Sequence, residues 1–220
     1  MTGQGFELTD ADLLERIRIE DRLVFERAAR DAGRWDEMAA CYHPDAEVDI
    51  SWFTGSGAAF VQASQAMAQG GNVSFHQIGQ SVVQLRGDRA TLDTDCTIHI
   101  FTELEGCGVA ITSFGRLRVR MEKRGGAWLI AGLRGIYLRD LMQPLDPNRI
   151  PQLDEDLLAG LRPSYRCLAY AMAKLGRPAS ATLPGIDRPD LVQSLIDAER
   201  AWLLDMATTE TNNHGRSLRA

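Results

Sequence analysis

The chain has 220 residues and a formal net charge of -6, with 45% hydrophobic and 25% charged residues. This composition is typical of a soluble globular protein, and the length is sufficient to bury a core. The acidic balance disfavours nucleic acid as a partner, because a phosphate backbone attracts clustered Lys and Arg. No apolar run approaches the roughly 20 residues of a membrane span, and the polar N-terminus does not resemble a signal peptide. We therefore expect a cytoplasmic protein with no nucleic-acid and no membrane partner.

The N-terminal region predicts two helices. Residues 9–32 carry apolar side chains near the 3.6-residue period of a helix, with Thr9 placed to cap its start. Gly33 then ends this helix. Residues 34–41 predict a second, short helix, and "HPDA" follows it as a turn.

Strands dominate the middle of the chain. After an alternating strand at 46–53 and a small helix at 55–69, four strand-like runs follow, at 74–86, 89–103, 108–123 and 127–139. "RGDR" forms a tight turn between the first two runs, and glycines separate the others. This order predicts an α+β fold in which helices pack on one face of a curved antiparallel sheet.

The part of the chain after the strands predicts a helical extension. A Pro-rich run, "MQPLDPNRIPQ", ends the first domain, and two helical patterns follow it. In the second pattern Asp187 can cap the helix and Pro189 lies in its first turn. We expect the α+β domain, the extension and a disordered tail to occupy residues 1–148, 149–207 and 208–220.

Asp31 and His76 are the first pair of candidate catalytic residues. An Asp near the C-terminus of a helix is unfavourable by up to about 1 kcal/mol, and an imidazolium beside it would compensate. An Asp–His pair also fixes the imidazole tautomer and makes the outer nitrogen a general base near neutral pH. In the alternative interpretation, Asp31 merely starts a turn and His76 is a strand residue with a backbone partner.

Several other residues are candidates for contact with a ligand. His99 shares one strand face with Asp95 and Phe101, and this face lines a cavity or meets solvent. Gln80 falls on the face of His76 by the period of two. Four further candidates either reach a ligand or pack in the core: Tyr42, Trp52, Arg134 and Tyr137.

Neither a metal site nor a disulfide is expected. The four cysteines form no CxxC or zinc pattern, which favours reduced thiols. Asp31, His76 and His99 could supply a two-His-one-carboxylate site, but their spacing matches no compact metal motif.

Three stretches resemble the SnoaL-like branch of the nuclear-transport-factor-2-like superfamily: "RDAGRWDEMAACYHPDAEVD", "HQIGQSVVQLRGDRA" and "WLIAGLRGIYLRDLMQPLDP". The resemblance extends from about residue 13 to residue 148. It implies a cone-shaped curved sheet whose pocket the N-terminal helices enclose. It does not fix a function, because this fold supports isomerases, dehydratases, dehydrochlorinases, hydrolases and non-catalytic subunits.

Within the superfamily the sequence is similar to the scytalone dehydratase and hexachlorocyclohexane dehydrochlorinase families. Those enzymes use an Asp–His dyad without metal or organic cofactor, and the matching positions are Asp31 and His76. A second histidine of the dehydratases matches His99. Arg30 stands where the dehydratases have a tyrosine, and Glu26 stands where the dehydrochlorinases have a lysine.

The resemblance implies a cofactor-independent lyase that removes a proton and eliminates water or formaldehyde from a small hydroxylated aromatic compound, with a lignin-derived dimer as one candidate. Asp31, His76 and His99 would be catalytic. Two alternatives stay open: an isomerase or hydrolase acting on a steroid-like or polyketide-like ligand, and a non-catalytic subunit or binding module. A homo-oligomer is expected, with a trimer favoured over a dimer.

Overall fold

The computed structural model describes residues 8–70 and 73–213, with side chains up to residue 205. Within these residues six strands form one strongly curved sheet, in the order β2-β1-β6-β5-β4-β3. The pairing is antiparallel except between β1 and β6, which run parallel. The strands are β1 (Tyr42–Ile50), β2 (Phe53–Ser56), β3 (Val73–Arg86), β4 (Arg89–Leu104), β5 (Cys107–Arg124) and β6 (Ala127–Pro144). The expected α+β fold with a curved, mostly antiparallel sheet is confirmed.

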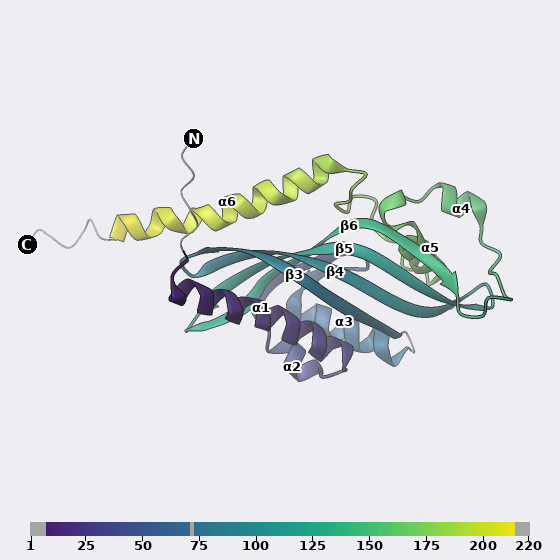
Figure 1. The fold of residues 1–220 in the computed structure, drawn as a ribbon, viewed down its shortest axis with the longest axis horizontal. Coiled ribbons are helices and arrows are strands. Elements are labelled where there is room, and N and C mark those ends of the chain that lie inside the picture. Colours follow the sequence, from purple (N-terminus) through teal and green to yellow (C-terminus); the bar gives the residue numbers. More distant parts are fainter. Residues whose placement is uncertain (1–7, 71–72, 214–220) are drawn as a thin grey trace, which may run out of the picture.

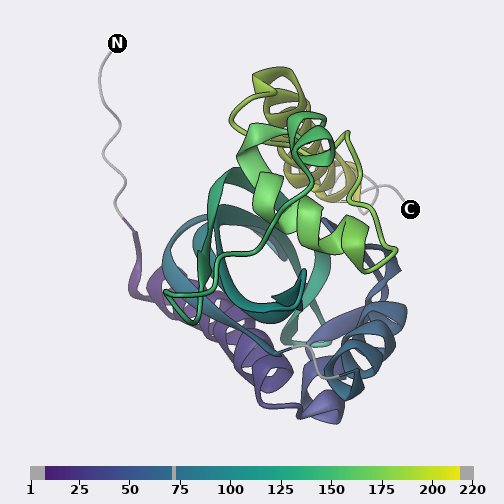
Figure 2. The ribbon, with the colours of Figure 1, turned by 90° about the vertical axis from the view of Figure 1, so that its right-hand side faces the viewer.

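Helices lie on both sides of this sheet (Figure 1). In that view α1 (Asp10–Asp31), α2 (Trp35–Ala39) and α3 (Gly57–Gln69) lie below the sheet, and α6 (Pro189–Asn213) lies above it. The short helices α4 (Glu155–Ala159) and α5 (Arg166–Lys174) lie at the far end of the sheet from the C-terminus. Figure 2 looks along the strands and shows how they coil around the interior.

The ends of α1 follow from its sequence. The Thr9 hydroxyl accepts a hydrogen bond from the Asp12 backbone at 3.1 Å, and the Asp12 carboxylate accepts one from the Thr9 backbone at 3.1 Å. This reciprocal capping box satisfies two N–H groups at the helix start. Gly33 follows the helix with a φ of 70°, a backbone conformation that favours glycine. The last turn of α1 therefore ends beside β3, which it contacts.

Irregular pairing bends the long strands around the interior. The register shifts between Ile78 and Ser81 on β3, and again between Phe114 and Gly115 on β5. Such bulges add a residue to one strand and increase its twist. A side chain at Gly115 would approach the Ile136 carbonyl oxygen to 2.6 Å, so this close approach between β5 and β6 requires glycine.

Several expected boundaries differ from the observed ones. The strand expected at 46–53 ends at Ile50, and a separate strand, β2, which was not expected, precedes a helix that begins at Gly57. The turn predicted at "HPDA" is wrong, because β1 already begins at Tyr42. Pro44 is tolerated inside the strand because the β1–β6 register shifts between Tyr42 and Glu47, where a ladder hydrogen bond is not required. The last strand, β6, also continues to Pro144 and thus includes the start of the Pro-rich run.

The extension contains more breaks than its pattern predicts. The first helical pattern is divided into α4, a 3₁₀ turn at Pro163–Tyr165 and α5, since Gly160 and Pro163 interrupt it. The Asp187 carboxylate pairs with Arg162 at 2.6 Å. Helix α6 extends to Asn213, within the tail expected to be disordered, and residues 214–220 of that tail lie outside the described residues.

Several contacts attach the extension to the sheet, and two of them involve α5 and α6. A buried cluster that includes Tyr137, Tyr165 and Leu168 packs α5 against β6. Helix α6 is held by its buried Glu199, which pairs with Arg118 of β5. Among the described residues no helix combines the length and the hydropathy of a membrane span.

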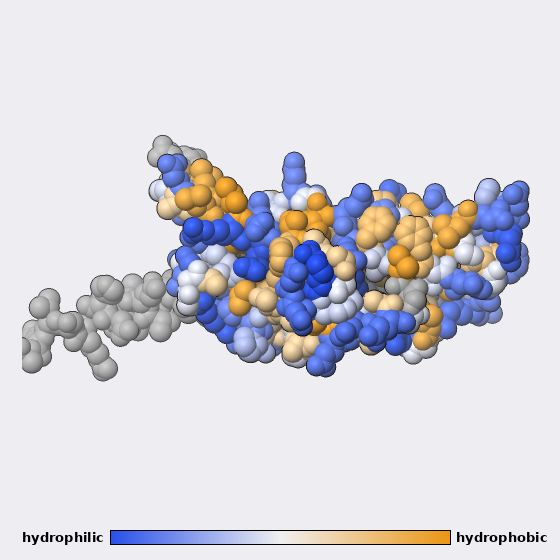
Figure 3. Space-filling view, turned by 90° about the horizontal axis from the view of Figure 1, so that it is seen from below, coloured by the Kyte–Doolittle hydropathy of each residue, from blue (hydrophilic) through white to orange (hydrophobic). Residues whose placement is uncertain are grey.

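The surface below the sheet is polar with scattered apolar areas (Figure 3). Large apolar side chains of α1 are among the exposed residues, namely Leu13, Leu14, Ile17 and Val24. The enclosed space on the other side of α1 is the feature that bears on function.

Candidate active site

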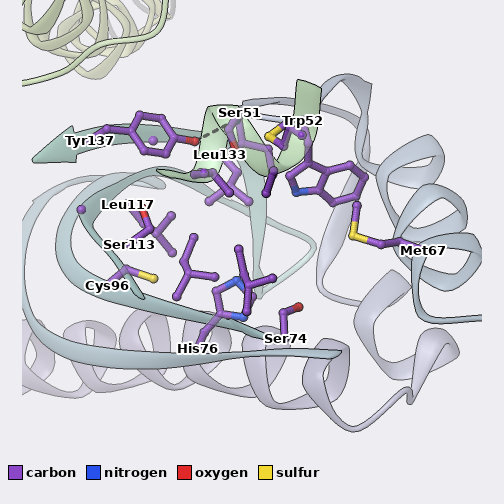
Figure 4. Close-up of a pocket in the computed structure, with 18 of the residues that line it drawn as sticks. Ser51, Trp52, Met67, Ser74, His76, Cys96, Ser113, Leu117, Leu133 and Tyr137 are labelled. Atoms are coloured by element: carbon purple, nitrogen blue, oxygen red, sulfur yellow. Dashed lines mark hydrogen bonds between the residues drawn. The ribbon is translucent and has the colours of Figure 1, made fainter. Parts of the chain in front are cut away.

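A cavity of about 210 Å³ lies between α1, the sheet and α5 (Figure 4). We call the sheet face that lines it, with Ile98 and Ile100, the inner face, and the opposite face the outer face. Met172 of α5 adds to a mostly apolar wall. The cavity is larger than the ~150 Å³ apolar cavity that admits benzene. It therefore has room for one substituted aromatic ring.

Asp31 and His76 are in contact at one wall of this cavity. The His76 Nδ1 atom lies 2.8 Å from Asp31 Oδ1, and the His76 backbone N–H donates to Asp31 Oδ2 at 2.7 Å. Both carboxylate oxygens are thus bound by one residue, which fixes the imidazole orientation. His76 lines the cavity, whereas Asp31 lies behind the imidazole and does not line the cavity. The Nε2 atom of His76 makes no hydrogen bond to any described residue. The arrangement predicted from the sequence is therefore present, with a nitrogen lone pair available to a ligand.

The environment of the pair keeps Asp31 charged and His76 neutral. Burial lowers the pKa of His76 to about 4, and the cations of Arg27 and Arg30 act in the same direction against the Asp31 hydrogen bond. For Asp31, burial opposes ionisation, but the hydrogen bonds from His76 outweigh it and lower the pKa. At neutral pH the charged carboxylate accepts from Nδ1–H, and Nε2 is unprotonated. This is the protonation state that a general base requires.

A hydroxyl group lies at the wall opposite His76 (Figure 4). Tyr137 is 5% exposed and lines the cavity, and its hydroxyl oxygen accepts a hydrogen bond from the Ser51 backbone at 2.7 Å. Burial raises the pKa of Tyr137 to about 12, so the phenol keeps its proton. Trp52, next to Ser51, presents its indole to the same space. Tyr137 and Trp52 are thus two predicted ligand-contacting residues that the structure places at the cavity.

His99, by contrast, faces away from the cavity. In the β3–β4 register His76 lies opposite Ile98, so His99 points to the outer face. There it stacks on Phe75, with ring centroids 4.6 Å apart, and its Nε2 contacts Gln77 at 2.9 Å. The expectation that His99 contributes to the site is wrong, because strand alternation puts the two histidines on opposite faces. The same geometry prevents His99 from sharing a metal ion with Asp31 and His76.

The remaining predicted residues also lie outside the cavity. Asp95 and Phe101 share the outer face with His99. Gln80 is exposed because the bulge between Ile78 and Ser81 breaks the alternation on which its assignment depended.

Arg134 and Tyr42 have other partners. Arg134 pairs with Asp49 at 2.6 Å and does not line the cavity, whereas its neighbour Leu133 does. Tyr42 is buried away from the cavity and donates to the Glu26 carboxylate at 2.8 Å.

Sequence reasoning did not assign the two buried arginines of α1 to the cavity. Arg27 and Arg30 of α1 are 3% and 8% exposed, and both line it. Arg27 pairs with the buried Glu26. The spacing of four residues between Arg27 and Asp31 is a signal that could have found the first, since it puts both on one helix face. Arg27 was not considered because arginine side chains are usually exposed to solvent.

The comparison with known families defines the class of protein. The family model for the SnoaL-like domain matches residues 14–134, which contain most of α1, the Asp31–His76 pair and most of the sheet. The chain therefore belongs to the SnoaL-like family, as its sequence predicted.

Individual relatives extend this assignment. A PEP2-like protein of the fungus Fusarium vanettenii is 30% identical over 183 residues, which are 80% of this chain and 77% of that protein. Two solved structures share the fold. A scytalone dehydratase-like protein of Novosphingobium aromaticivorans has a TM-score of 0.52 at 16% identity, over 63% of this chain and 93% of that one. The hexachlorocyclohexane dehydrochlorinase of Novosphingobium barchaimii has a TM-score of 0.52 at 19% identity, over 66% of this chain and 99% of its own.

Proposed function

We propose that the protein is a cofactor-independent lyase that eliminates water from a small hydroxylated aromatic compound. The observation that carries the proposal is the Asp31–His76 contact at 2.8 Å, with Nε2 free at the wall of an apolar cavity. The fold also contains enzymes named for elimination reactions, a dehydratase and a dehydrochlorinase among its structural neighbours. That likeness shows the fold alone, so the residues of the cavity must support the chemistry.

His76 is the base in this scheme. Its Nε2 removes a proton from a carbon of the substrate, and the electron pair of that C–H bond becomes the new C=C bond. Asp31 holds the ring in position and stabilises the imidazolium that forms. Because His76 is neutral at neutral pH, it can take the proton without first losing one.

Tyr137, at the opposite wall, donates a hydrogen bond to the oxygen that leaves the substrate. Its hydroxyl oxygen accepts from the Ser51 backbone, so its own proton remains free to be donated. The C–O bond breaks with its electron pair on oxygen, and a hydrogen bond from Tyr137 stabilises that charge. The proton first taken by His76 passes to the hydroxide and completes the water released. In this scheme Tyr137 is the third catalytic residue, in place of His99, which the family resemblance had implied.

The size of the cavity restricts the substrate. Its volume of about 210 Å³ lies below the ~300–1,000 Å³ of typical ligand pockets. One ring with a short side chain fits within this volume, whereas a two-ring lignin-derived dimer exceeds it. We therefore favour a single-ring substrate.

The proposal is tested with a panel of phenyl compounds that carry a hydroxyl group β to an acidic C–H. The purified protein is assayed in the presence of EDTA, and the conjugated product is followed by its ultraviolet absorbance. His76→Gln should lower kcat/KM by at least ~100-fold, the usual contribution of a positioned general base. His99→Gln is the matched control, because it removes a histidine of the neighbouring strand from the outer face, and it should keep the wild-type rate.

Three results contradict the proposal: an unchanged rate in His76→Gln, a rate that depends on added metal, and release of formaldehyde in place of water. Proton exchange with D₂O at the acidic carbon, without elimination, would instead indicate an isomerase that uses the same base.

A further inference from the structure

Leaving aside any charge on His76, the charged residues that line the cavity are all positive. Arg27, Arg30, Arg116 and Arg177 line it, and no described aspartate or glutamate does. An enclosed, mostly apolar space with cations and no anion at its wall favours a ligand that brings negative charge. The question is which of the four arginines is free to meet that charge.

Two of the four already have carboxylate partners. Arg27 is bound by Glu26, with one contact from its Nη2 to Oε1 at 2.5 Å. Arg116 lies opposite Asp95 in the β4–β5 register, and its guanidinium pairs with Asp93 at 2.6 Å and with Asp95 at 3.2 Å on the outer face, away from the cavity. Their charges are therefore largely compensated within the protein. Arg177 is exposed at the rim of the cavity, where water solvates it.

Arg30 differs because it is buried and poorly paired. Its two hydrogen bonds to described residues both come from Nη1, to Asp31 at 3.3 Å and to Ser74 at 3.5 Å, which are long. The Asp31 oxygen concerned already accepts from His76. The Nε atom of Arg30 is buried without any hydrogen-bond partner. One edge of the guanidinium, Nε and Nη2, thus has no acceptor among the described residues.

A buried donor without a partner is unusual in a folded protein and calls for an explanation. Burial, followed by repulsion from Arg27, lowers the pKa of Arg30, as expected for a buried guanidinium without a well-paired carboxylate. A carboxylate that meets a guanidinium accepts charge-assisted hydrogen bonds from it, which are stronger than those between neutral groups.

We propose that Arg30 binds the carboxylate of the ligand and that the cavity selects aromatic carboxylic acids over uncharged aromatic compounds. This inference rests on the proposed function for the reaction, but the binding step it describes is independent of it. Ser74 and His76 project from the same face of β3, and Ser74 contacts Arg30, so a bound carboxylate lies near the base. Arg30 then also stabilises negative charge that builds up on the substrate when His76 takes the proton.

The test compares unreactive ligands of equal shape and different charge. Benzoate and cinnamate are titrated into the full chain by calorimetry, alongside benzamide and cinnamamide. The wild type should bind each acid at least ~10-fold more tightly than its amide, as expected for charge-assisted hydrogen bonds. In Arg30→Met the ratio should fall to about 1, while the amides still bind. Arg30→Lys, which keeps the charge but loses the planar edge, should give an intermediate ratio.

Arg34→Met is the matched control, because Arg34 follows the same helix, is exposed and pairs with Glu37, and it should leave the ratio unchanged. The wild-type comparison needs no variant and decides the matter even if Arg30→Met does not fold. The inference is overturned if acids and amides bind the wild type equally, if neither acid binds at ~10 mM, or if Arg30→Met keeps the preference. None of these ligands can undergo elimination. Loss of the catalytic role of His76 would therefore leave the result readable, and His76→Gln should keep the preference for acids.

Discussion

The protonation of His76 offers the sharpest test of the site. The imidazole has a pKa of about 4 in the folded protein and about 6.5 in the unfolded chain. Between these values the unfolded chain holds a proton that the folded protein does not, so stability increases with pH across this window. The contribution is complete above about pH 6.5 and is lost at pH 4 and below. The difference corresponds to about 3 kcal/mol of unfolding free energy.

Two measurements check this value. Urea unfolding at pH 7 and at pH 4 should show a loss of stability in the wild type that is smaller by about 3 kcal/mol in His76→Gln. His99→Gln should keep the wild-type loss, since it removes a partly exposed imidazole from the outer face. In NMR spectra the His76 ring signals, assigned by their absence in the variant, should not titrate between pH 5 and pH 8. A midpoint near 6.5, or an equal loss of stability in His76→Gln, would refute the described environment.

Further predictions concern the neighbours of this residue and the extension. Asp31→Asn should reduce kcat/KM by roughly 10- to 100-fold, because it removes the charge that orients and stabilises the imidazolium; steady-state kinetics with far-ultraviolet circular dichroism as a folding control would show whether activity alone changes. Tyr137→Phe should lower kcat more than it raises KM, and an effect on KM alone would contradict a role in the departure of the hydroxyl group. Glu199→Gln should destabilise the protein by about 1–3 kcal/mol, since it leaves the buried Arg118 with one carboxylate fewer; an unchanged thermal midpoint would argue against this contact as the attachment of α6.

The sequence predicted the fold and half of the site well, for identifiable reasons. Element type follows local patterns, so the helix that starts at Thr9 and the meander of long strands were accessible from periodicity alone. The Asp31–His76 contact joins residues 45 positions apart, and no local pattern indicates such a distance. Only the likeness to a known family led to that pair.

The errors at the site have two causes, which are the assignment of a side chain to a strand face and the burial of charged side chains. For His99 the strand pattern offered a polar face and an apolar face, and the polar face was considered as a cavity lining, whereas the apolar face with Ile98 and Ile100 is the inner one. For Gln80 an extra residue in β3 reversed the alternation. Arg27 and Arg30 were overlooked because burial of a guanidinium depends on tertiary contacts, such as those of Arg27 with Tyr42 and Phe60, which the linear sequence does not reveal.

Because α5 lines the cavity, the walls of this cavity come from two parts of the chain with different roles. The base and its carboxylate belong to residues 14–134, the part shared with the SnoaL-like family. Leu168 and Met172, which close the cavity, belong to the segment after β6. Variation in that segment can alter which molecules are admitted while the chemical groups stay in place. Among relatives with a similar dyad, divergence after the last strand is therefore where we expect differences in selectivity to be encoded.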